Sequence, residues 1–230
     1  MDIFYRLVLA HLIADFPLQT DKVFTVKVRY RWGVLIHGFI VGLMSFILVF
    51  PYLQDIQVWT SLILLWLLHT FQDKEKIIYN LQIERNNLWT FLTDQILHIG
   101  AIGLACFGFS NLTPIIYKGL VWDIYWSNKI VIIIALLFVV TYGANVLISY
   151  IKNTIFNKEL VFFHGKTKYF GILERFAVSI LIWFGGAYYF LLIFSFIPGI
   201  YLFIRKKISG IDIILSWGIA IIVGFILKIA

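Results

Sequence analysis

The sequence has little charge, little proline and almost no cysteine, and each shortage excludes a class of protein. Charged residues make up 13% of the 230 positions, against about 25% in a typical soluble domain, so an ordinary soluble protein is excluded. Four prolines and the lack of a Ser/Gly-rich tract leave no room for a linker or a disordered tail. The single cysteine, Cys106, excludes an intrachain disulfide and a cysteine-based zinc cluster, and we expect it to be a small apolar helix residue.

Hydrophobic residues, in contrast, make up 61% of the chain, and the mean hydropathy is +0.92. Apolar runs of about 17–25 residues can cross the hydrocarbon core of a bilayer, and this sequence contains a succession of them. We therefore predict an all-α fold, a polytopic bundle with seven or eight transmembrane helices. These helices are expected over residues 2–18, 33–53, 57–76, 88–110, 128–150, 170–186, 188–204 and 211–228.

The basic residues lie in alternate predicted loops, which is the positive-inside pattern of membrane proteins. The basic loops are 19–32, 77–87 with the helix end before it, 151–169 and 205–209. We expect these loops to be cytoplasmic and both termini to lie outside, in a multi-pass protein of the inner membrane. The alternation requires eight helices, so it favours a break at Gly185-Gly186 within the apolar stretch 170–204. It also accounts for the net charge of +7 without a nucleic-acid partner.

The first apolar segment is expected to be a retained helix. Asp2, His11 and Asp15 interrupt the long apolar run that a cleavable signal peptide needs, and Arg6 is the only early positive charge. We expect this helix to end at Phe16-Pro17, because the residue before a proline disfavours helical backbone.

Histidine and aspartate recur in pairs four residues apart inside the apolar segments. This spacing corresponds to about 6 Å of rise and about 40° of rotation on a helix, so both side chains of a pair share one face. A charged carboxylate near the bilayer centre costs about 2.5–3.5 kcal/mol or more unless it is paired or hydrated, so such groups indicate function. With His37, the pairs form what we term the His/Asp cluster: His11, Asp15, His37, His69, Asp73, Asp94 and His98.

By the predicted orientation, all members of this cluster lie at similar depth near the cytoplasmic side, on the first four helices. We therefore expect a four-helix polar core over residues 1–110, supported by helices over residues 111–230, in one membrane domain. Imidazole and carboxylate ligands without thiolate suit zinc, manganese or iron. A metal-bound water or a polarised phosphoryl oxygen would then support hydrolysis or group transfer.

The residues form three groups of candidates. All seven members of the His/Asp cluster are candidate metal ligands. Carboxylates with a candidate catalytic role are Asp15, Asp73, Asp94 and Glu174, and the candidate substrate-binding residues are Gln19, Lys22, Lys27, Lys74 and Gln95. Together they predict a metal-dependent hydrolase or transferase acting on an anionic lipid or a lipid-linked phosphate from the cytoplasmic leaflet.

Other interpretations of the same residues stay open. The cluster also suits a transporter or proton-coupled permease, since chains of Asp and His carry protons in such proteins. It is equally compatible with a non-catalytic assembly subunit. Glu174 is an extra ligand or acid, or it pairs with a loop lysine. Asn145 and Thr141 are expected to form hydrogen bonds between helices, and His164 is expected at the surface.

The order of these residues resembles a bacterial integral-membrane family known as domain of unknown function 3307. The resemblance rests on the segment from His11 to Gln19, followed by Lys27 and His37, then His69-x-x-x-Asp73, and then Phe91-x-x-Asp94-Gln95-x-x-His98. Gly171-Ile-Leu-Glu174-Arg175 is similar to a further segment of that family, whereas the extreme C-terminus departs from it. The resemblance implies a shared site in the first four helices and carries no established activity.

Overall fold

The computed structural model describes residues 2–82, 87–107, 109, 112–160, 162 and 165–229, and every regular element within these ranges is helical. This agrees with the predicted all-α fold. By its internal contacts the chain divides into two compact units, Met1–Ile132 and Ile133–Ala230.

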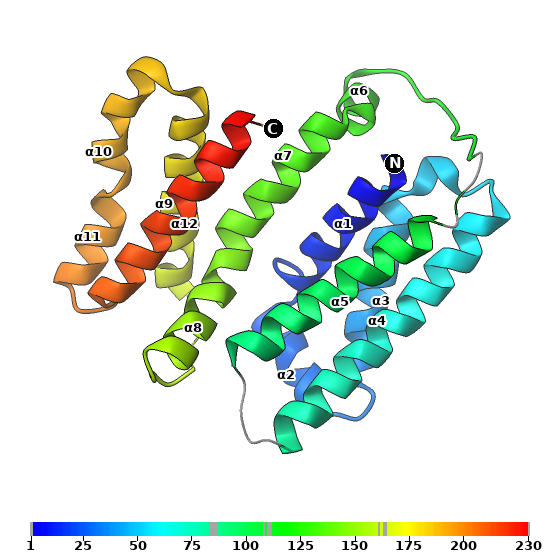
Figure 1. Cartoon of the computed structure of the whole chain (residues 1–230), viewed down its shortest axis with the longest axis horizontal. Helices are drawn as coiled ribbons and strands as arrows, with labels where there is room; N and C mark the ends of the chain where they lie inside the picture. The colour runs from blue at the N-terminus through cyan, green and yellow to red at the C-terminus, as the bar shows by residue number, and fades with distance from the viewer. Residues whose placement is uncertain are drawn as a thin grey trace. The chain divides into compact units, whose positions relative to one another are not determined.

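The first unit is built around four longer helices, drawn from blue to green in Figure 1. Its elements are α1 (Asp2–Asp15), α2 (Asp21–Arg29), α3 (Gly33–Leu48), the short 3-10 turn Phe50–Tyr52, α4 (Ile56–Gln82), α5 (Leu88–Phe107), α6 (Leu120–Trp126) and the first residues of α7 (Asn128–Phe138). Helix α3 packs against α1, α2 and α4, while α5 packs against α4 and α1. The four helices that carry the His/Asp cluster are therefore linked in a ring, in the order α1, α3, α4 and α5.

The second unit contains the remaining helices, drawn from green to red in Figure 1. They are the π-turn Val139–Gly143, α8 (Ala144–Ile155), α9 (Gly165–Phe184), the 3-10 segment Gly186–Leu191, α10 (Leu192–Ser195), α11 (Ile197–Ile204) and α12 (Gly210–Ile229). Helices α9 and α12 pack along each other. Their apolar core includes Val140, Val178, Ile182, Ala220 and Leu227.

Four helical segments are long and apolar enough to cross a membrane, which indicates a membrane protein. They are Leu88–Phe107, Asn128–Ile155, Gly186–Ile204 and Gly210–Ile229. Helix α3 is apolar but shorter, and α1 has only 14 residues. Helix α4 has 27 residues, but its C-terminal part carries the charged run from Asp73 to Lys76.

The predicted loop over residues 19–32 is wrong in one respect, because it contains the helix α2. The hydroxyl of Thr20 caps this helix by accepting a hydrogen bond from the backbone N–H of Val23 at 3.4 Å. Lys27 and Arg29 lie in its last turn, where positive charge interacts favourably with the helix dipole. A Cβ atom at Gly33 would lie 1.9 Å from the carbonyl oxygen of Val26, so the close approach of α2 to α3 requires glycine there.

The long apolar stretch over residues 170–204 is broken, as the charge pattern of the loops favours. Helix α9 ends at Phe184, and Gly185 and Gly186 follow with φ angles of +68° and +57°. L-amino acids with a side chain rarely adopt this left-handed backbone, whereas glycine does so without steric cost. Two glycines in succession therefore end the helix and start a second apolar segment.

Arg6 fixes the first helix within its unit. The side chain is 1% exposed and donates to the Asn128 Oδ1 atom at 2.7 Å and to the backbone carbonyl of Tyr125. Its guanidinium also lies 4.5 Å from the ring centroid of Tyr125, a cation–π contact. A buried guanidinium needs partners for its donors, and the hydrogen bonds of its two terminal nitrogens define the position of α1 along its own axis.

Candidate functional site

The structure brings together all seven members of the His/Asp cluster. His11 and Asp15 come from α1, His37 from α3, and the other two pairs from α4 and α5. None of the seven residues is more than 6% exposed. Buried ionisable groups in such number are costly unless they pair with one another or bind a ligand.

Each pair four residues apart shares a helix face, as its spacing predicts. The His11 Nδ1 atom lies 3.6 Å from the Asp15 Oδ1 atom. The corresponding distances are 3.3 Å from His69 Nε2 to Asp73 Oδ2 and 3.7 Å from His98 Nδ1 to Asp94 Oδ1. His98 Nδ1 also lies 2.7 Å from the backbone carbonyl oxygen of Asp94, so this contact assigns the proton of His98 to Nδ1.

Asp15 is the point where the helices meet. Its Oδ1 atom lies 3.2 Å from the His37 Nε2 atom on α3 and 3.6 Å from the His69 Nε2 atom on α4. Its Oδ2 atom accepts from the Gln95 side-chain amide on α5 at 3.4 Å. One carboxylate therefore contacts side chains from all of the other three helices of the site.

Gln95 links the carboxylates of α1 and α5. Its Nε2 atom also donates to the Asp94 Oδ2 atom at 3.2 Å, and its Oε1 atom lies 3.4 Å from the His11 Nε2 atom. An amide that is held at both ends orients the side chains that it contacts. Gln95 therefore lies at the cluster, where it contacts three of the seven members directly.

Two lysines reach the cluster from different helices. The Lys27 ammonium on α2 lies 2.7 Å from the Asp73 Oδ1 atom and donates to the Gln19 Oε1 atom at 3.0 Å. Gln19 in turn donates to the backbone carbonyl of Asp15 at 3.0 Å. The Lys76 ammonium lies 2.6 Å from the Asp94 Oδ2 atom. Lys27 and Gln19 are therefore part of the site.

The sequence did not predict Lys76 as a member of the cluster; it grouped Lys76 with the basic residues on the cytoplasmic side that could hold an anionic headgroup. A signal for it does exist, because Lys76 follows Asp73 by three residues and so lies on the same helix face.

Three other predicted site residues do not join the cluster. Lys22 and Lys74 are exposed. Glu174 lies in the second unit, where its Oε1 atom accepts from the Trp217 indole at 2.9 Å and from the backbone N–H of Gly199 at 3.1 Å. These described partners replace the loop lysine that we expected. The expected surface position of His164 falls outside the described residues.

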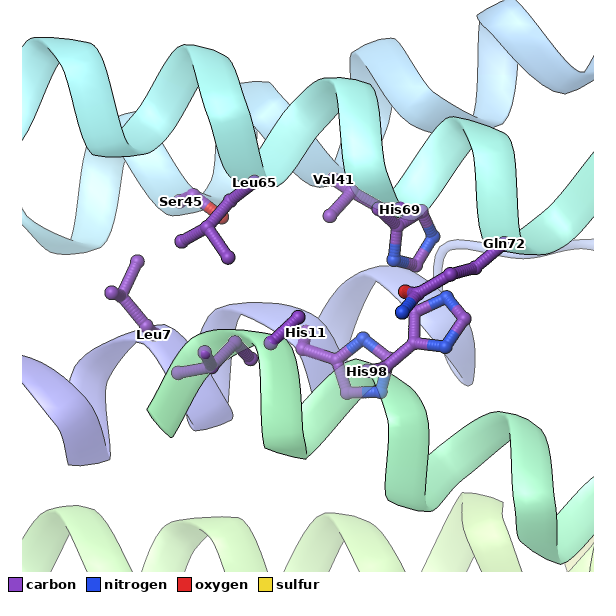
Figure 2. A pocket seen from close by; sticks show the side chains of 10 residues that line it. Leu7, His11, Val41, Ser45, Leu65, His69, Gln72 and His98 are labelled. Carbon is purple, nitrogen blue, oxygen red and sulfur yellow. The ribbon is translucent and has the colours of Figure 1, made fainter. Parts of the chain in front are cut away.

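A small cavity adjoins the cluster, and Figure 2 shows His11, His69, His98 and Gln72 converging on it. Its volume is about 20 Å³, which is room for one water molecule but not for an organic group. Within the described part of the chain, the Nε2 atom of His98 and the Oε1 atom of Gln72 have no hydrogen-bond partner, whereas the Nε2 atom of His69 faces the carboxylates of Asp73 and Asp15. Gln72 is a second residue missed from the sequence, although it follows His69 by three positions on one helix face.

The donor atoms of the cluster are close enough to share metal ions. Three groups have donor atoms that all lie within 4.8 Å of one another: His11 with Asp15 and His69, His37 with His69 and Asp73, and Asp73 with Asp94 and His98. Mixed imidazole and carboxylate donors suit zinc, manganese and iron. The groups overlap at His69 and Asp73, so these two residues are central to any ion site.

The fold and the site define a helical protein with a buried His/Asp cluster and helices apolar enough to span a membrane. The chain belongs to the family described as Protein of unknown function (DUF3307), whose model matches residues 3–121. This match confirms the resemblance seen in the sequence and includes the whole His/Asp cluster with Lys27 and Lys76. No curated protein and no solved structure matches the chain.

Proposed function

We propose that this protein is a multi-pass inner-membrane hydrolase or transferase that depends on a divalent transition metal. It acts from the cytoplasmic leaflet on a lipid-linked phosphate or ester. The observation that carries the proposal is the convergence of buried nitrogen and oxygen donors from four helices within metal-binding distance. The His98 Nε2 atom, which has no hydrogen-bond partner and lies beside a cavity for one water, adds to it.

The roles of the residues follow from their contacts. Asp15 would hold the ion together with His11 and His69, while Gln95 would orient Asp15 and His11 through its two hydrogen bonds. When bound, Zn²⁺, Mn²⁺ or Fe²⁺ lowers the pKa of a coordinated water to about 7 and polarises a phosphoryl or carbonyl oxygen. The remaining carboxylates, Asp73 and Asp94, would accept protons or position the lysines beside the reacting group.

The substrate class follows from the surroundings of the cluster. Lys22 and Lys74 are exposed on α2 and α4, the helices that bring Lys27 and Asp73 to the site. Exposed basic side chains near a membrane surface attract anionic lipid headgroups by about 1 kcal/mol each. A phosphate on a lipid would therefore be held close to the cluster while its acyl chains stay in the bilayer. Seven or eight transmembrane helices with cytoplasmic basic loops complete this proposal.

Elemental analysis of the full chain purified in detergent tests the proposal. We expect a stoichiometric transition metal in the wild type and its loss in Asp15→Asn. The matched control is Asp123→Asn, because Asp123 is an exposed carboxylate on α6. A wild type that binds no zinc, manganese or iron after reconstitution would contradict the proposal. Hydrolysis of lipid-linked phosphates by the loaded protein would then identify the reaction.

A second candidate function is a proton or ion relay within a transporter. The imidazole rings form a continuous series, with centroid distances of 5.1 Å from His11 to His98, 4.1 Å from His98 to His69 and 5.3 Å from His69 to His37. Such a series suits proton transfer between rings. Ion flux that depends on pH, measured in liposomes with metal-free protein, would favour this function over hydrolysis.

A further inference from the structure

We infer that the His/Asp cluster is a one-ion site centred on Asp15, in which Lys27 and Lys76 act as permanent counter-ions for the other two carboxylates. The inference rests on the proposed metal dependence and adds the number of ions, their position and two positioning residues. It follows from the charges of the cluster and from which of them are already paired.

The charges of the cluster do not balance. It contains three carboxylates, on Asp15, Asp73 and Asp94, and it is approached by two ammonium groups, on Lys27 and Lys76. Among the described residues, this leaves one carboxylate without a lysine or arginine partner. A buried carboxylate without a positive partner is strongly unfavourable, and under the proposed metal dependence a metal ion bound by neutral imidazoles supplies that partner.

The missing charge can be assigned to one carboxylate. Asp73 and Asp94 each have an ammonium nitrogen within 2.7 Å. Asp15 is contacted by three imidazoles and the Gln95 amide, and within the described residues no lysine or arginine lies within ion-pairing distance of it. The third cation of the cluster therefore belongs at Asp15.

The same pairing selects among the three possible ion sites. The group formed by Asp73, Asp94 and His98 has both carboxylates paired with lysine, so a second divalent cation there would face two ammonium groups. The group formed by His37, His69 and Asp73 has its one carboxylate paired with Lys27. The group formed by His11, Asp15 and His69 contains the uncompensated carboxylate and imidazole ligands. A single ion in this group also lies beside the cavity that His11 and His69 line, which is where a bound water would find room.

Lys27 and Lys76 are therefore positioning residues that act through Asp73 and Asp94. Lys27 has the further effect of attaching α2 to the cluster, since it contacts both Asp73 and Gln19. Removing either ammonium group without replacing its charge would leave a second buried carboxylate uncompensated. A second divalent cation would then become favourable in the cluster.

Binding of Mn²⁺ to the full chain in detergent tests the inference. Equilibrium dialysis gives the number of ions per chain, and electron paramagnetic resonance distinguishes an isolated Mn²⁺ from a coupled pair. We expect one uncoupled ion in the wild type. In Lys27→Met and Lys76→Met we expect a second equivalent or at least 10-fold tighter binding. The matched controls are Lys22→Met and Lys74→Met, which remove exposed lysines from the same two helices and should leave one ion.

Carboxylate variants keep the test decisive if a lysine variant does not fold. Asp15→Asn should weaken Mn²⁺ binding at least 100-fold, whereas Asp94→Asn should retain one ion with less than a 10-fold change. Two ions in the wild type, a reversed order of the two Asn variants, or no change in folded Lys→Met variants would each overturn the inference. Two ions in the wild type would overturn the one-ion inference but would agree with the proposed metal dependence. One ion at Asp15 in a protein without hydrolase or transferase activity would overturn the proposed function and leave the inference intact.

Discussion

The two units each bury charged residues, but they satisfy them to different degrees. In the second unit every guanidinium nitrogen of Arg175 is hydrogen-bonded. Its Nε atom donates to the carbonyl of Val140 at 2.8 Å, one terminal nitrogen to the Ser216 hydroxyl at 3.0 Å, and the other to the carbonyl of Thr141 at 2.9 Å and the Asn145 Oδ1 atom at 2.5 Å. In the first unit, the Nδ1 atom of His37 and the Nε2 atom of His98 lack such partners.

This difference separates a structural cluster from a candidate binding site. The carbonyls that Arg175 contacts belong to the π-turn Val139–Gly143, where the regular helical hydrogen-bond pattern is interrupted. Arg175 thus compensates for that interruption and joins α9 to the helix of α8 and to α12. A guanidinium with all of its nitrogens hydrogen-bonded stabilises the fold, whereas the unpartnered His98 Nε2 and Gln72 Oε1 atoms beside a cavity are suited to a ligand.

The largest effect is expected from the substitution Arg175→Met. It leaves two backbone carbonyls and two side chains without their donor, and breaking a buried charged network typically costs about 3–5 kcal/mol. Thermal unfolding in detergent should show a large decrease in stability, while bound metal per folded chain should stay at the wild-type value. Loss of metal from folded protein would contradict the assignment of the second cluster to structure.

His69→Ala should have the next largest effect, and on binding rather than on stability. His69 belongs to two of the three candidate ion groups, so its loss should weaken metal binding by more than the about 10–100-fold that changes around a metal's ligands cause. Its Nε2 atom lies 3.3 Å from the Asp73 Oδ2 atom and 3.6 Å from the Asp15 Oδ1 atom. Both carboxylates keep other partners, Lys27 and His37 respectively, so the loss of stability should be smaller than for Arg175→Met. Isothermal titration with Zn²⁺ and thermal unfolding of the apoprotein measure the two effects separately.

Gln95→Leu should weaken metal binding by about 10–100-fold, because it removes an amide that orients ligand side chains. Gln95 contacts Asp15, Asp94 and His11, so the ligands keep their chemistry but lose their orientation. The matched control is Gln57→Leu, at an exposed position of α4, which should not change the affinity. Equal affinities for Gln95→Leu and the wild type would show that Gln95 has no orienting role.

The smallest effect is expected from Thr20→Ala at the start of α2. Loss of a helix N-cap costs about 1 kcal/mol, and here it should loosen the helix that carries Lys27. Hydrogen exchange should become faster in the backbone amides of Asp21–Arg29 and stay unchanged in α5. Slower exchange in α2, or an equal change in exchange rate across the whole first unit, would mean that the Thr20 cap does not stabilise α2 specifically.

The pairing of His and Asp was predictable because it depends on one helix at a time. A spacing of four residues determines that two side chains share a face whatever the helix packs against, and three such pairs point to one buried site. The helix break at Gly185-Gly186 was predictable for a similar local reason. The convergence of these side chains on Asp15 depends on how four helices pack, so the sequence alone did not determine it.

The helix α2 and the inward direction of Lys27 and Lys76 were not predictable in this way. Basic residues between apolar segments have an ordinary explanation in membrane topology, and that explanation hides the ones that pair with a buried carboxylate. The segment that forms α2 is short and mixed in composition. Its conformation depends on the close contact of Gly33 with Val26 and on the ion pair of Lys27 with Asp73, and the second of these joins residues far apart in the sequence.

The anchoring of Arg6 has a consequence for residues that it never touches. A helix transmits a shift along its axis from end to end, and Asp15 lies nine positions, or about 13 Å, further along α1 than Arg6. The bond from Arg6 to Asn128 therefore sets the height of Asp15 among its neighbours. A substitution at Asn128, more than a hundred residues away in the chain, would therefore allow α1 to shift along its axis and would displace the Asp15 carboxylate.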